Sequence, residues 1–199
     1  MKRARLLACR GYSLLEVIVV VGVIGVISAI AIPMTANTLA NFRVSGDARG
    51  AANAVALAKM RAASIFSTVR VHVTLASRNY FLERWDKGTN TWTADGGTTS
   101  LSQNVVFGFG VVTAAPAFTQ GAIGQAPLCK DNAGVDIAGT ACVIFNSRGV
   151  PVDSTGAPTA VDAVYITDGN AVFGITISAT GMIRTWRTLP TATPVWAKQ

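Results

Sequence analysis

The sequence predicts an α+β protein in which a long N-terminal helix packs on a C-terminal antiparallel β-sheet or β-sandwich. Three observations lead to this fold class. From Leu14 to Ile32 the chain is almost entirely apolar, with Glu16 as the one charged residue. Apolar residues then recur at intervals of three and four, the period of an amphipathic helix. From Val69 onward the period changes to two, which is typical of strands. A helix followed by strands favours an α+β layer arrangement.

The first element is an apolar helix that can cross a membrane. The run has 19 residues, and as a helix it would span roughly 28 Å, close to the hydrocarbon core of about 30 Å. Four basic residues and no acid precede it, namely Lys2, Arg3, Arg5 and Arg10. By the positive-inside rule this end stays in the cytoplasm and the rest of the chain is exported.

A removed secretory signal peptide is the alternative interpretation of the same run. The small residues Ala29-Ile30-Ala31 offer a site that resembles a signal-peptidase site. Glu16 argues against it. A carboxylate in a membrane segment costs about 2.5–3.5 kcal/mol on insertion scales, and an ordinary secretory signal would not carry one at the start of its apolar region. The length of the run and its helical continuation argue against it as well.

The second element is an amphipathic helix over residues 34–66. Its apolar stripe comprises Leu39, Phe42, Ala48, Ala52, Val55, Ala58, Ala62 and Ile65. Pro33 lacks an N–H, so we expect it to kink the helix or to interrupt it locally. The chain therefore divides into a basic leader (1–11), an apolar transmembrane and assembly helix (12–33), the amphipathic helix (34–66) and a β-rich head (67–199).

The head is predicted to consist of a hairpin, a long irregular middle and a C-terminal meander. Residues 69–75 and 80–85 alternate around a turn at 76–79 and predict the hairpin. Trp92 is expected to anchor the loop 86–100. The remaining strand candidates are residues 104–112, 141–145, 161–167, 171–178 and 182–188, with a long loop over 113–140.

Composition limits the possible functions. The formal net charge is +7, but the four basic residues of the leader supply more than half of it. The charge alone is therefore no argument for nucleic acid. Cys9 lies in the leader, whereas Cys129 and Cys142 form an even pair in the exported part, where a disulfide is the default expectation. Zinc is the rival, but no CxxC or HxxxH spacing supports it. We predict no metal and no cofactor.

No residue pattern indicates an enzyme. A Ser-His-Asp site needs a histidine that is held by an acid and faces a nucleophile. The single histidine, His72, falls on the polar side of a predicted strand, where we expect it to be exposed. The neighbouring acids Glu83 and Asp86 have no apparent pocket.

The segment Gly11-Tyr12-Ser13-Leu14-Leu15-Glu16, with its basic leader, resembles the processing motif of type IV prepilins and type II secretion pseudopilins. The resemblance implies that a prepilin peptidase cleaves after Gly11 and that the new amino terminus, Tyr12, is methylated. It also implies that Glu16 pairs with the amino terminus of a neighbouring subunit during assembly. A carboxylate that merely snorkels to the membrane surface is the alternative. Pro33 falls where many pilins have a kinking proline.

Three further segments resemble the FimT/GspH group, which comprises minor pilins and the H-type pseudopilin. They are residues 58–63 in the helix, the turn 145–149 and the C-terminal stretch 175–184. The resemblance implies a minor pilin of a type IV pilus, located at or near the filament tip, with other pilins or pseudopilins as partners. It also implies an inner-membrane protein with a cytoplasmic N-terminus and a periplasmic head, which later enters the filament. The alternative is the H-type minor pseudopilin of a type II secretion system.

A pilus-associated DNA receptor is a third hypothesis. The candidate residues are Arg184, Trp186, Arg187 and Lys198, because cations beside an aromatic ring can hold phosphate and stack a base. Some FimT-like proteins use a Gly-Arg-x-Arg element in this region. Here Met182 follows Gly181, so the first arginine is missing. A solvated strand face with one core aromatic residue is the alternative.

Overall fold

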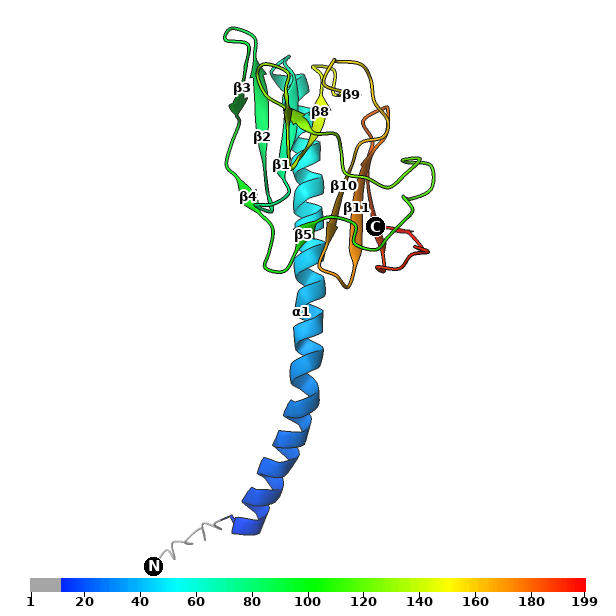
Figure 1. The fold of residues 1–199 in the computed structure, drawn as a ribbon. Helices are drawn as coiled ribbons and strands as arrows, with labels where there is room; N and C mark the ends of the chain where they lie inside the picture. The colour runs from blue at the N-terminus through cyan, green and yellow to red at the C-terminus, as the bar shows by residue number, and fades with distance from the viewer. Residues whose placement is uncertain (1–11) are drawn as a thin grey trace, which may run out of the picture. The chain divides into compact units, whose positions relative to one another are not determined.

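The computed structural model describes residues 12–199. Its only helix within this range, α1, extends from Leu14 to Ser64, and all strands follow it (Figure 1). The contacts divide the chain into a unit that ends at Ala40 and a unit from Asn41 to Gln199. The α+β fold class is therefore confirmed, with the predicted order of helix and strands.

In the first unit, α1 begins with a side-chain cap. The Ser13 hydroxyl accepts a hydrogen bond from the Glu16 N–H at 3.2 Å, which satisfies one of the free donors of the first turn. The helix continues through position 33, so Pro33 does not end it. The kink at Pro33 stays a prediction.

The second unit contains two antiparallel sheets and a short ribbon. In the first sheet the order is β3-β2-β1-β8-β9, and β4 also pairs with β2. Its strands are β1 (Val69–Thr74), β2 (Asn79–Asp86), β3 (Thr91–Ala94), β4 (Thr99–Ser100), β8 (Thr140–Phe145) and β9 (Pro151–Val152). The second sheet has the order β13-β12-β11-β10-β5. Its strands are β5 (Val106–Phe107), β10 (Ala163–Thr167), β11 (Val172–Ile177), β12 (Ile183–Thr188) and β13 (Ala197–Lys198). The ribbon pairs β6 (Cys129–Lys130) with β7 (Asp136–Ile137).

The C-terminal part of α1 lies between the two sheets, with β1 and β2 on one side and β10 and β11 on the other (Figure 1). Small helix residues make this contact possible, because they let strands approach the helix closely. Val44, Ala48, Ala51, Val55, Ala58 and Ala62 are buried together with inward-facing residues of both sheets. Of the eight residues of the predicted apolar stripe, four are thus buried and Ala52 is partly buried. Leu39, Phe42 and Ile65 are exposed instead. The core contact of the helix begins only at Val44, and Ile65 follows the end of the helix.

The predicted hairpin is confirmed, with Val71 opposite Leu82 in the β1–β2 register. Three other predictions are corrected. The long loop expected over 113–140 contains the two short strands of the ribbon, β6 and β7. The loop expected over 86–100 contains β3 and β4, which extend the hairpin sheet. The strand expected over 104–112 shrinks to the two residues of β5. On either side of it, Asn104 and Gly110 adopt φ values of +65° and +58°, which an extended strand does not allow.

One lysine of the helix joins the ends of both sheets. The Lys59 Nζ donates a hydrogen bond to the Gly181 carbonyl in the β11–β12 turn at 2.9 Å. Its side chain also lies so close to Gly149, in the β8–β9 turn, that a Cβ there would come within 3.2 Å of the Lys59 Cγ. We call this contact the Lys59 clasp. It brings together the three segments that carry the FimT/GspH resemblance.

Candidate functional site

The first candidate site is the apolar segment Leu14–Ile32, which we call the anchor segment. It is the one helical segment within residues 12–199 that is long and apolar enough to cross a membrane, with a mean hydropathy of 2.8. None of it is buried in the protein. Its apolar side chains are exposed on all sides of the helix, so lipid or other apolar helices must cover them. The anchor segment is therefore a candidate membrane anchor.

Glu16 is the single charge in this segment and lies in the first turn of α1. Within residues 12–199 its carboxylate has no ion pair or hydrogen bond. A carboxylate near a helix N-terminus is favoured by the helix dipole, but in a dry environment it still needs a counter-charge. Tyr12, the predicted new terminus, precedes the helix and is exposed. Gly11, the predicted cleavage residue, lies outside the described residues.

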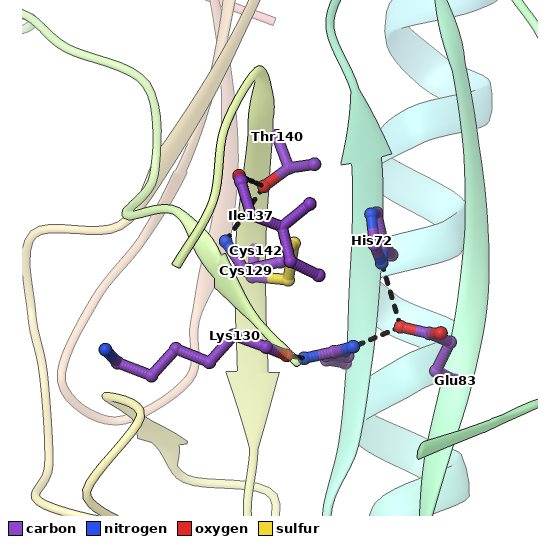
Figure 2. Close-up of a disulfide and its surroundings, with 8 residues drawn as sticks. His72, Glu83, Cys129, Lys130, Ile137, Thr140 and Cys142 are labelled. Atoms are coloured by element: carbon purple, nitrogen blue, oxygen red, sulfur yellow. Dashed lines mark hydrogen bonds and ion pairs between the residues drawn. A yellow bond between two sulfur atoms is a disulfide. The ribbon is translucent and has the colours of Figure 1, made fainter. Parts of the chain in front are cut away.

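The second candidate site is the outer face of the first sheet, where the predicted disulfide is present. Cys129 in β6 is bonded to Cys142 in β8, and both residues are buried (Figure 2). The bond attaches the β6–β7 ribbon to the sheet. Thr140 adds to the attachment, because its hydroxyl accepts from the Cys129 N–H at 3.0 Å and donates to the Ile137 carbonyl at 2.6 Å.

A buried charge network lies beside the disulfide. Arg70 Nε donates to Glu83 Oε2 at 2.6 Å, and the same oxygen is 2.9 Å from His72 Nδ1 (Figure 2). Arg70 Nη1 also donates to the Lys130 carbonyl at 2.6 Å, and its guanidinium lies 4.0 Å from the centre of the Trp92 ring. Burial alone would raise the pKa of Glu83, but the hydrogen bonds and charges of His72 and Arg70 outweigh it and lower the pKa.

His72 is buried, with 8% of its surface exposed, which corrects the prediction of an exposed histidine. Its ring stacks on Phe81 at 4.7 Å between centroids. A nitrogen of His72 and the two sulfurs lie within 4.8 Å of one another, a grouping that can suggest a metal site. In the disulfide the sulfurs are not thiolates, however, and thiolate is the form that binds a metal. We interpret the network as a brace between the hairpin and the β6–β7 ribbon.

The sequence predicted the two strands of this network but not their register. The predicted turn at 76–79 would pair residue 75 with residue 80 and would place Arg70 opposite Trp85, whereas the structure places Arg70 directly opposite Glu83. The contact of Arg70 with Lys130 could not have been predicted either, because it depends on where the disulfide places the ribbon.

The third candidate site is the group of residues proposed for DNA binding on β12 and β13. In the register Trp186 lies opposite Lys198, and Arg184 is two residues before Trp186, so these three share one face of the sheet. Arg187 belongs to the other face, where its guanidinium lies 5.9 Å from the Phe173 ring centre. Trp186 is half-buried, and its indole N–H donates to the Thr176 hydroxyl at 2.9 Å. The structure thus brings together three of the four candidates.

No protein-family model matches the chain, and neither does a curated protein. Among solved structures, the chain is similar to two structures of the minor pseudopilin EpsH from the type II secretion system of Vibrio cholerae. One aligns at 11% identity with a TM-score of 0.45 and covers 72% of this chain and 95% of that chain. The other aligns at 11% identity with a TM-score of 0.44 and covers 79% and 97%. Values this low establish neither the family nor the function of this chain.

Proposed function

We propose that this protein is a membrane-anchored structural subunit of a pilin-like filament. The observation that carries the proposal is the anchor segment, which is apolar and exposed on all sides and has one carboxylate, Glu16, in its first turn. A helix of this kind is stable in lipid, and equally stable among identical helices in the core of a filament. Leader removal, extraction from the inner membrane and packing of the anchor segments would make up its mechanism.

The finer assignment that we propose is a minor pilin of a type IV pilus, at or near the filament tip. The H-type minor pseudopilin of a type II secretion system is the alternative, and it shares every feature on which the proposal depends. A deletion strain separates the two, because loss of pili or of transformation indicates the pilus. Loss of protein secretion with normal pili indicates the secretion system.

The test of the proposed mechanism is Glu16→Gln. This change removes the charge and keeps most of the shape, so membrane insertion should be at least as efficient as in the wild type. Entry into the filament should fall, because the amide offers no counter-charge to a neighbouring amino terminus in a dry interface. The measurement is the ratio of filament-associated to membrane-bound protein, with leader removal checked in the same samples.

Asp136→Asn is the matched control for Glu16→Gln. It also removes one carboxylate, but from an exposed pair with Lys130 in the head, and it should leave the ratio unchanged. Unchanged incorporation of Glu16→Gln would show that the carboxylate only snorkels. An equal loss in both variants would show that the assay reports total charge rather than pairing.

A DNA receptor is a second candidate function, favoured by the common face of Arg184, Trp186 and Lys198. Binding through phosphates should weaken steeply with salt, and Lys198→Gln should weaken it for every DNA sequence. A gel shift with the detergent-solubilised protein at two salt concentrations is the test. No shift at low salt would exclude this role.

A further inference from the structure

A small pocket lies in the second sheet where β11, β12 and the 117–119 loop meet. Its volume is about 160 Å³, and the residues that matter for its chemistry are Arg184, Phe118, Thr119, Thr176, Ser178 and Met182. We call it the Arg184 pocket. No acidic residue is among the described residues that line it. The pocket is much smaller than the roughly 300–1,000 Å³ of sites that enclose a whole small molecule, so it suits a single chemical group.

The guanidinium of Arg184 has no partner within residues 12–199. Its Nε is shielded from solvent and has no hydrogen-bond acceptor, and none of its nitrogens takes part in an ion pair. A buried donor without an acceptor is costly, and a charged one more so. Arg70, whose side chain is buried, satisfies its donors with a carboxylate and a carbonyl. Arg184 has the same chemistry but lacks the acceptor.

A second donor is directed by the hydrogen bond from Trp186. The Thr176 hydroxyl oxygen accepts a hydrogen bond from the indole N–H of Trp186. The hydroxyl proton of Thr176 is therefore directed away from Trp186 and can be donated to another group. No acceptor for that proton is found in the described part of the chain, although Thr176 is buried, with 4% of its surface exposed. The pocket therefore offers donors from two neighbouring strands and lacks a negatively charged acceptor.

The rim of the pocket is apolar and exposed. Phe118 is completely solvent-exposed and adopts a φ of +60°, a backbone conformation that bulky residues rarely take. Met182, which also lines the pocket, is half-exposed. A ligand group in the pocket would thus have apolar side chains around the part of the ligand that remains outside.

We propose that the Arg184 pocket binds the C-terminal carboxylate of a partner polypeptide that ends in an apolar residue. A guanidinium matches the two oxygens of a carboxylate in a bidentate geometry. Single-stranded nucleic acid is less suitable, because it is held by a groove with several cations, and Arg184 is the one cation that lines this pocket. The inference does not depend on the proposed filament role, since it concerns only the head.

The test is a titration of the full processed chain in detergent, followed by NMR through the Arg184 Nε–H signal. The probe is the tetrapeptide Ac-Ala-Ala-Ala-Phe with a free C-terminus, and its C-terminal amide is the first control. The free acid should shift the signal to saturation and the amide should not. Arg184→Gln should weaken binding, as seen from the peptide signals, by about tenfold or more.

Arg187→Gln is the matched control, because Arg187 is on the same strand but on the other face of the sheet. It should bind the peptide as the wild type does. Phe118→Ala should weaken binding of the peptide that ends in Phe but not of one that ends in Ala. Saturation by the dinucleotide pTpT with no response to the peptide would overturn the proposal in favour of nucleic acid. Absence of peptide binding, or equal binding by Arg184→Gln, would also overturn it. None of these results bears on the incorporation of Glu16→Gln, so the two proposals fail independently.

Discussion

At the scale of single residues, the Lys59 clasp depends on Gly149 and Gly181, which both have a positive φ. Gly181 has a φ of +73°, and a Cβ added there would lie 2.6 Å from the Gly149 carbonyl oxygen. Gly169 has a similar φ of +87°, but no atom lies within 4 Å of its Cβ position. Substitutions at Gly169 and Gly181 therefore separate the cost of backbone strain from the cost of a steric clash.

We expect Gly169→Ala to lower the free energy of unfolding by about 1–2 kcal/mol through backbone strain alone. Gly181→Ala should lower it by roughly 1–3 kcal/mol more, because the turn must also move away from the β8–β9 turn. Denaturant unfolding of both variants measures the difference. Equal losses would mean that the clasp opens without cost.

Asp162 gives the head a pH dependence of its own. Burial raises the pKa of Asp162 to about 6, against a weak hydrogen bond from Thr159. A raised pKa means that the folded state binds the proton more tightly than the unfolded state does. The contribution of Asp162 to the free energy of unfolding should therefore be largest below about pH 4 and should fall as the pH rises through about 6.

Asp162→Asn should remove this loss. The variant should unfold like the wild type at pH 4 and should be more stable at pH 7.5, by an amount on the order of 3 kcal/mol. Thermal unfolding across this range is the measurement. Glu83 acts in the opposite direction, since its pKa is lowered and its stabilisation is lost as the pH falls. A difference between the two proteins that does not vary with pH would contradict the assignment to Asp162.

The processing of the leader is a prediction about Gly11 and Tyr12. Mass spectrometry of the membrane-bound protein should find a chain that begins at Tyr12 with a methylated amino terminus. Gly11→Val should leave the leader attached, whereas Gly11→Ala should be tolerated best. A chain that begins near Ile32 would instead establish an ordinary signal peptide.

At the scale of elements, the β6–β7 ribbon is held to β8 by the disulfide and by the Arg70 hydrogen bond to Lys130. The bond joins residues 13 apart in the sequence. A closed loop of about this length contributes roughly 3 kcal/mol in the chain-entropy model. Cys129→Ala/Cys142→Ala should lower the free energy of unfolding by that amount. Reduced wild-type protein should behave like the double variant, and an alkylating reagent should label neither cysteine without reductant.

The elements that were predictable from the sequence are those with local patterns. The helix follows from its three-and-four period and the hairpin from its alternation around residues 76–79. Strands β3 and β4 were not predictable, because each exists through its pairing with β2. The burial of His72 was missed for the same reason. Alternation placed it on the polar side of the strand, whereas the distant β6–β7 ribbon and disulfide cover that side.

At the scale of the whole molecule, the candidate sites differ in how far the sequence could reveal them. The anchor segment and Glu16 form a contiguous stretch, so composition alone identifies them. The Arg184 pocket was not predictable, because Phe118 and Arg184 are far apart in the sequence and Phe118 lies in a stretch without periodicity. Arg184 was selected for its neighbour Trp186. The structure gives Trp186 a different role, which is to orient Thr176.

The position of the three cysteines has a consequence for oxidative folding. In the proposed topology Cys9 stays on the cytoplasmic side, and the exported chain carries only Cys129 and Cys142. Two thiols allow a single intramolecular pairing, so the exported chain cannot form a wrong internal disulfide. The protein should therefore require a periplasmic thiol oxidase but no disulfide isomerase. Its steady-state level should fall in an oxidase-deficient strain and stay unchanged in an isomerase-deficient one, as an immunoblot would measure.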